Sequence, residues 1–75
     1  MSTFEARYRE IEKNLFLVAV GYLRNTEDAR DALQEAAITG YLSYPSLKDQ
    51  TRFKSWMTKI VIRKCLDLLR REKTR

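Results

Sequence analysis

Apolar residues recur at helical spacing through the first third of the chain, and this pattern constrains the fold more than any other feature. The stripe comprises Phe4, Tyr8, Ile11, Leu15, Val18, Ala19 and Tyr22. Intervals of three and four residues place all of these side chains on one face of an α-helix. The 75 residues also include just two glycines and one proline, which leaves little scope for strands. The sequence therefore predicts an all-α fold.

A second helix is expected directly after the first. The turn at Arg24 and Asn25 is short, so the second helix should return antiparallel to the first. Asn25 or Thr26 is suited to capping its N-terminus. We expect this helix to end near Ser43, because the residue before Pro45 is disfavoured in helical conformation.

The remainder of the chain predicts a loop and a long basic helix. Residues from Pro45 to Gln50 should form the loop, and the third helix should run from about Thr51 to about Glu72. A chain of this length forms one small domain, here residues 1–75, that buries only about 60% of its unfolded surface. The expected architecture is a small bundle of three to four helices with the first two antiparallel.

Composition excludes several classes of protein. No apolar run approaches the roughly 18 residues that a membrane span requires, so we expect a cytoplasmic protein without membrane insertion. Cys65 stands alone and histidine is absent, which excludes an internal disulfide and a zinc cluster. Because there is no glycine-rich phosphate loop and no nucleophile paired with a base, we expect no enzyme, no cofactor and no small-molecule substrate.

Charge is unevenly distributed along the chain. Residues 1–48 carry six Lys and Arg against seven Asp and Glu, a net charge of −1, whereas residues 49–75 carry nine against three, a net charge of +6. A basic terminal segment of this kind is expected of a protein that binds a phosphate backbone. The acidic segment then needs a different partner.

The second helix has two faces when its residues are placed at about 100° intervals. One face is a core stripe of Ala29, Leu33, Ala36, Gly40 and Tyr44. The other, here called the acidic face, comprises Asp31, Gln34, Glu35, Ile38 and Leu42. One interpretation is a docking surface for a basic, amphipathic partner, with the aliphatic side chains as anchors. The other is that these aliphatic residues are scattered or touch another part of the bundle, which is common.

The third helix carries a row of positive charge. Its basic stripe comprises Arg52, Lys59, Arg63 and Arg70, which lie close to one line on the helix. Trp56 and Asp67 border this stripe, and further charge follows at Arg71, Lys73 and Arg75. The opposing core face comprises Phe53, Met57, Ile60, Val61 and Leu68. A solvated helix face would explain the stripe, but few carboxylates are near enough to pair with it, which favours binding of phosphates.

Several short motifs occur along the chain at characteristic separations: NTEDA at residues 25–29, DALQEA at 31–36, FKSW at 53–56, KI at 59–60 and DLLRR at 67–71. Together they resemble conserved region 2 of bacterial extracytoplasmic-function (ECF) sigma factors. The resemblance spans nearly the whole chain. It implies a promoter-recognition subunit of RNA polymerase.

The resemblance also implies roles for particular residues. In the family, the helix with the D-x-x-Q-E block docks on the clamp-helix coiled coil of the polymerase β′ subunit, which assigns that contact to Asp31, Gln34, Glu35 and Ile38, with Leu42 on the same face. The last helix and the preceding loop bind the non-template strand of the promoter −10 element with one base extruded. The implied DNA contacts are Lys59, Arg63, Asp67, Arg70 and Arg71. Phe53 and Trp56 would brace that surface. Anti-sigma factors commonly cover these surfaces in the family and are a further expected partner.

The chain departs from the family pattern at three places. Where the family usually has an aromatic, a basic and a glycine residue in the loop, this chain has Leu47, Lys48 and Asp49, so a loop stacking contact does not carry over. Arg63 stands where the family commonly has asparagine, so the preferred −10 bases do not carry over. Family members continue into a helix-turn-helix domain that nothing after Arg75 supplies, so we expect an excised or truncated domain that binds duplex promoter poorly.

Two alternatives to promoter recognition remain. The first is a small helical interaction module that acts as a regulatory adaptor without specific DNA recognition. The second is a simple helix-turn-helix DNA binder, which the lack of a short glycine-containing turn before a compact recognition helix disfavours. The salt dependence of nucleic-acid binding separates the first alternative from promoter recognition.

Overall fold

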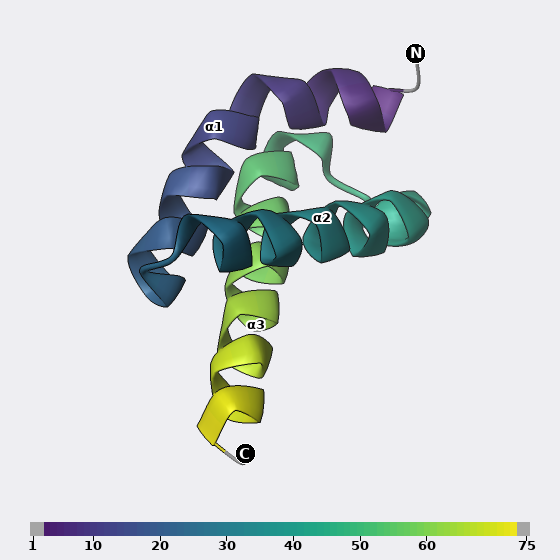
Figure 1. Cartoon of the computed structure of the whole chain (residues 1–75). Coiled ribbons are helices and arrows are strands. Elements are labelled where there is room, and N and C mark those ends of the chain that lie inside the picture. The colour runs from purple at the N-terminus through teal and green to yellow at the C-terminus, as the bar shows by residue number, and fades with distance from the viewer. Residues whose placement is uncertain (1–2, 74–75) are drawn as a thin grey trace.

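The structure, a computed structural model, describes residues 3–73. Three helices, α1 (Thr3–Leu23), α2 (Thr26–Ser43) and α3 (Phe53–Lys73), account for most of it, and the short 3₁₀ turns η1 (Tyr44–Ser46) and η2 (Gln50–Arg52) lie between α2 and α3. No strand occurs within residues 3–73 (Figure 1). The all-α fold predicted from the sequence is confirmed.

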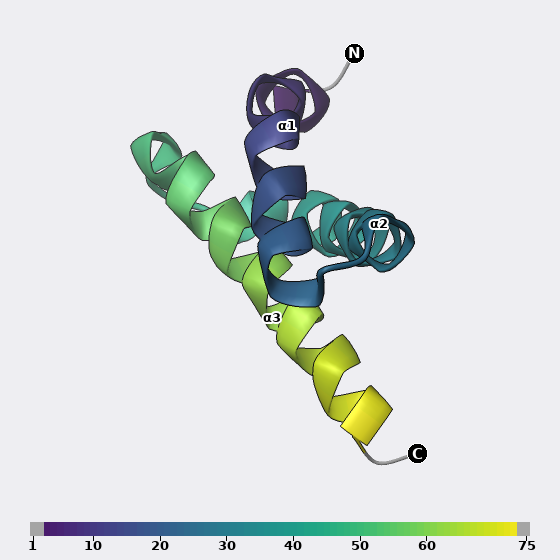
Figure 2. The ribbon, with the colours of Figure 1, turned by 60° about the vertical axis from the view of Figure 1, so that its left-hand side comes forward.

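The helices cross around one core. The N-terminal half of α1 runs antiparallel to α2, as predicted, and α1 then curves around the core (Figure 1). Helix α3 crosses both of the others, and its last turns extend beyond them in both views (Figure 2). The domain is elongated, with extents of 38 × 21 × 19 Å. One end of the basic helix therefore stands clear of the rest of the molecule.

Large side chains from α1 and α3 meet across small residues of α2. The buried residues are Phe4, Tyr8, Leu15 and Ala19 of α1, Ala29, Ala32, Ala36 and Gly40 of α2, and Phe53, Met57, Val61 and Cys65 of α3. A Cβ atom on Gly40 would lie 2.6 Å from Sδ of Met57 and 3.2 Å from Cε1 of Phe4. Close approach of the helices therefore depends on this glycine. Tyr22, at the end of the predicted apolar stripe, is 42% exposed.

The turn between α1 and α2 is defined by two residues. Arg24 has a φ of 54°, in the left-handed region that ends many helices, and its N–H donates to the Val20 carbonyl at 2.7 Å. The Asn25 side chain accepts from the Asp28 N–H at 2.9 Å. Of the two caps predicted for α2, Asn25 is therefore the one used.

The connection between α2 and α3 differs in detail from the predicted loop and helix start. Helix α2 ends at Ser43 as predicted, but the predicted loop contains two 3₁₀ turns and α3 begins at Phe53 rather than Thr51. The Asp49 side chain accepts from the Thr51 N–H at 3.0 Å and also from its hydroxyl. These local hydrogen bonds, which lower the pKa of Asp49, stabilise a turn at the place where an α-helix was expected to start.

Candidate polymerase-docking and nucleic-acid-binding surfaces

The acidic face of α2 lies open to solvent. All five of its residues are exposed, including Ile38 at 60% and Leu42 at 72%. Along the helix the two carboxylates precede the two aliphatic side chains. A packing role inside this bundle therefore does not account for Ile38 and Leu42.

Tyr41 enlarges this surface and was missed by the sequence analysis. Its side chain is 54% exposed, and its ring contacts Phe4 edge-on with centroids 5.9 Å apart. Its place on the helical wheel, beside Gln34, was the available signal. Ile38, Tyr41 and Leu42 together form an exposed apolar patch next to the carboxylates.

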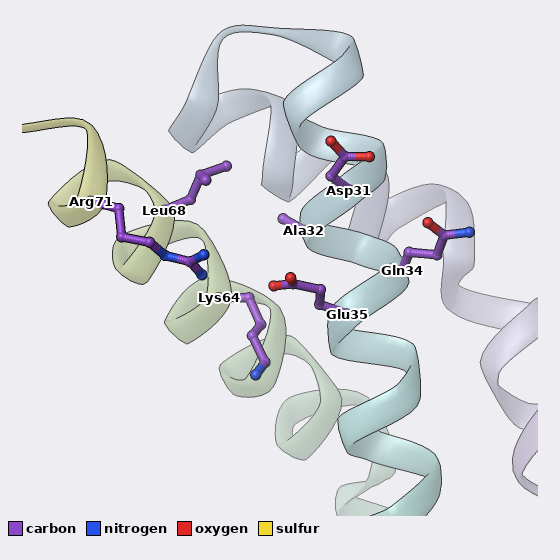
Figure 3. A pocket seen from close by; sticks show the side chains of 7 residues that line it. All are labelled: Asp31, Ala32, Gln34, Glu35, Lys64, Leu68 and Arg71. Carbon is purple, nitrogen blue, oxygen red and sulfur yellow. The ribbon is translucent and has the colours of Figure 1, made fainter. Parts of the chain in front are cut away.

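A groove of about 310 Å³ separates the acidic face from α3. Its lining residues are Asp31, Ala32, Gln34 and Glu35 of α2 and Lys64, Leu68 and Arg71 of α3 (Figure 3). Glu35 points into the groove toward α3, and the Arg71 guanidinium points toward α2. Arg71, predicted as a DNA contact, therefore lies on the side of α3 that faces α2.

Four of the five predicted DNA contacts lie together on α3. Lys59, Arg63, Asp67 and Arg70 line a shallow hollow of about 330 Å³. Ile62 and Leu66 complete its lining, and Leu66 is 43% exposed. Both aliphatic residues were missed, although the helical wheel places Leu66 beside the basic stripe. The hollow thus combines cations with apolar contact area.

Two of the four cations of the basic stripe lie near a carboxylate and two do not. Arg52 Nε lies 3.5 Å from Asp49 Oδ2, and Arg70 Nη1 lies 4.0 Å from Asp67 Oδ1. Exposed pairs of this kind contribute little to stability. Lys59 and Arg63 form no ion pair with any residue in the described range. Lys73 and Arg75, the other predicted extensions of positive charge, have side chains outside the described part.

An aromatic cluster supports the N-terminal end of the basic stripe. Phe53 is 2% exposed, and its ring lies 5.8 Å from that of Trp56 and 5.9 Å from that of Tyr44. Phe4 packs against the same group at 5.8 Å from Phe53. Trp56 is half-buried at the edge of the cluster. Phe53 is therefore a core residue, and Trp56 lies between the core and the surface.

The described residues also bear on metal binding, thiol reactivity and membrane insertion. No group of three or more His, Cys, Asp or Glu side chains there is arranged to hold a metal ion. Cys65 is fully buried, and burial raises the pKa of its thiol, which disfavours the reactive thiolate. None of the helices in this range is long and apolar enough to span a bilayer.

The chain belongs to the sigma-70 region 2 family, because the model of that family matches residues 7–75. Within the family it resembles the extracytoplasmic-function class. It is similar to the ECF RNA polymerase sigma factor SigM of Mycobacterium tuberculosis, with 36% identity over 70 residues that cover 93% of this chain and 36% of SigM. The resemblance inferred from the sequence motifs is confirmed.

A second relative comes from a different genus. The RNA polymerase sigma factor SigV of Bacillus subtilis is 31% identical over 62 residues, which cover 83% of this chain and 37% of SigV. The chain therefore spans a little over a third of the length of these relatives. No solved structure matches it.

Proposed function

We propose that this domain recognises promoters by binding two partners, core RNA polymerase through the acidic face of α2 and the promoter −10 element through the basic stripe of α3. The observation that carries the proposal is the presence of two exposed surfaces of opposite charge on separate helices of a sigma-70 region 2 domain. A partner that carries one sign of charge would be attracted to one of these surfaces and repelled by the other, so the two surfaces suit two different partners.

The acidic face fits the clamp-helix coiled coil of the polymerase β′ subunit. Exposed Ile38 and Leu42 offer apolar area whose burial stabilises a complex by about 1.5–3 kcal/mol for each side chain that is fully covered. Asp31 and Glu35 would orient a basic partner helix, and Gln34 would add a hydrogen bond. This division between apolar anchors and charged rim is typical of protein interfaces.

The basic stripe fits the non-template strand of the −10 element. Lys59 and Arg63 have no carboxylate partner in the described range and are free to neutralise phosphates. The connection between α2 and α3 carries Lys48 and Arg52, both exposed, and continues the positive surface toward the N-terminus of α3. Arg70 and Asp67 would contact the strand nearer the C-terminus of α3. Phe53 and Trp56, which pack on the core side of the first turns of α3, would hold this surface in place.

Replacing Lys59 and Arg63 tests the DNA contact. The variant Lys59→Ala with Arg63→Ala should weaken binding of a single-stranded −10 oligonucleotide about tenfold and reduce the slope of log affinity against log salt by about 1.4, since each lost phosphate contact removes about 0.7. Fluorescence anisotropy measures both quantities. Arg9→Ala with Lys13→Ala, which removes the same charge from α1, is the matched control.

If the variant and the control bound the oligonucleotide alike, the basic stripe would have no specific role. Binding that did not depend on salt would favour the alternative of an interaction module without DNA recognition.

Replacing the two carboxylates tests the polymerase contact. Asp31→Ala with Glu35→Ala should lower the affinity for core polymerase about tenfold, because two charge pairs at a protein interface are lost. Co-purification with core polymerase, followed by surface plasmon resonance, measures the effect. Glu10→Ala with Glu72→Ala removes the same charge from other faces and should leave capture unchanged. Undiminished capture of the first variant would remove the docking assignment.

A further inference from the structure

Arg7 of α1 reaches across to the connection between α2 and α3. Its Nη1 donates to Oε1 of Gln50 at 2.7 Å, and its Nη2 donates to the Gln50 backbone carbonyl at 2.7 Å. The guanidinium carbon also lies 4.8 Å from the centroid of the Phe53 ring. One side chain therefore contacts both the last part of the connection and the first residue of α3, although the bonded residues are 43 positions apart in the sequence.

The side-chain oxygen of Gln50 accepts a second hydrogen bond, from the start of the same connection. The Tyr44 hydroxyl donates to Gln50 Oε1 at 2.7 Å, and Gln50 Nε2 lies 3.4 Å from the Leu47 carbonyl. The Tyr44 ring is itself held by Phe4 at 5.6 Å and Trp56 at 6.4 Å. We call Arg7, Tyr44 and Gln50 the clasp, because together they join both ends of the connection to α1.

The chemistry of the clasp requires arginine. A planar guanidinium donates two parallel hydrogen bonds, here to a side-chain and a main-chain oxygen of the same residue, and stacks on an aromatic face. Lysine would supply the same charge, but its compact ammonium group cannot reproduce the two parallel hydrogen bonds together with the contact to the aromatic ring. Arg9, two residues further along α1, is exposed, and its side chain makes no hydrogen bond or ion pair with the described residues. The clasp is therefore specific to one of two nearby arginines.

We infer that Arg7 is a positioning residue: the clasp holds residues 47–52 in one conformation and so sets where Lys48 and Arg52 stand relative to Lys59 on the DNA-binding surface. The inference rests on the proposed function for its consequence in DNA binding. Pre-ordering a binding loop raises affinity because the loop loses less freedom when the ligand arrives. Arg7 itself does not contact DNA in this account.

The experiment compares Arg7→Gln with Arg9→Gln, which remove one positive charge each from the same helix. Amide hydrogen exchange of residues 47–52 in the free domain should become about tenfold faster in Arg7→Gln and stay unchanged in Arg9→Gln, because a charged hydrogen bond to the connection is lost only in the first. Affinity for the single-stranded −10 oligonucleotide should fall about fivefold more in Arg7→Gln than in Arg9→Gln. Affinities are compared under conditions in which both variants have the same far-UV circular dichroism spectrum as the parent domain.

Gln50→Ala distinguishes positioning from a general effect on stability. Adding Gln50→Ala to Arg7→Gln should weaken DNA binding by less than Gln50→Ala does in the parent chain, since the Arg7–Gln50 bonds are already lost and only the Tyr44–Gln50 bond remains to be removed. Gln50→Ala alone also replaces Arg7→Gln if that variant does not fold. Arg7→Lys should recover less than half of the lost affinity.

Equal affinities of Arg7→Gln and Arg9→Gln would overturn the inference, because charge alone would then explain the loss. Full additivity with Gln50→Ala would overturn it as well. If the parent domain did not bind the oligonucleotide, the proposed function would fail, while the exchange rates would still decide whether Arg7 orders the connection.

Discussion

At the scale of single residues, burial changes the chemistry of Tyr8. Its side chain is 8% exposed in the core between α1 and its neighbours. Desolvation, with a smaller contribution from the nearby Glu12 carboxylate, raises the pKa of this phenol from 10.0 to about 12. The native state therefore keeps the Tyr8 proton at pH values where the unfolded state has lost it.

This shift predicts a loss of stability at high pH. Between pH 10 and about 12 the unfolded state binds fewer protons at Tyr8 than the native state, so the free energy of unfolding falls as pH rises through this range. Below pH 10 the full stabilising contribution of Tyr8 is present. Tyr8→Phe should flatten that part of the curve, because phenylalanine has no proton to lose. Urea unfolding at a series of pH values measures it.

Tyr22→Phe, which removes an exposed phenol from the same helix, serves as the reference for the Tyr8 measurement. Equal alkaline slopes for Tyr8→Phe and the parent chain would contradict the burial of the Tyr8 side chain.

At the scale of the elements, the packing of α2 depends on its small residues. Gly40 faces Met57, whose side chain is fully buried and has no free space beside it. By contrast, a Cβ atom on Gly21 of α1 would meet no atom within 4 Å. Gly40→Ala should therefore destabilise the domain by about 1–2 kcal/mol from overpacking. Gly21→Ala should stabilise it by about 0.5–1 kcal/mol, since alanine is favoured in helices.

Chemical denaturation of the two glycine variants checks this pair of opposite effects. Stabilisation by alanine at position 40 as large as that at position 21 would mean that α2 and α3 are not in close contact there.

The elements also show where sequence reasoning succeeds. Local chemistry limited the cap to Asn25 or Thr26, of which Asn25 is used, and placed the end of α2 near Ser43, because a side-chain acceptor and a following proline act within a few residues. The contact of Arg7 with Gln50 was not predicted, since it joins residues that are distant in the sequence. Helical periodicity grouped the acidic face apart from the core stripe without deciding between docking and packing. It also could not show that Arg71 faces α2 while Arg63 is exposed elsewhere on α3.

At the scale of the whole molecule, the two proposed surfaces are arranged so that one partner need not displace the other. The groove between α2 and α3, with Glu35 and Arg71 on opposite walls, separates them (Figure 3). The C-terminal turns of α3 extend beyond the other helices (Figure 2). Polymerase bound at α2 would thus leave the outer side of α3 open to DNA.

The most direct measurement of this arrangement is an ¹⁵N nuclear magnetic resonance titration of the domain with each partner separately. One ligand is the single-stranded −10 oligonucleotide, and the other is a coiled-coil peptide of the β′ clamp helices. We predict that the oligonucleotide shifts amide signals of residues 47–70, and that the peptide shifts those of residues 31–42. Shifts on the same helix face with both ligands, or oligonucleotide shifts centred on the acidic face, would contradict the account.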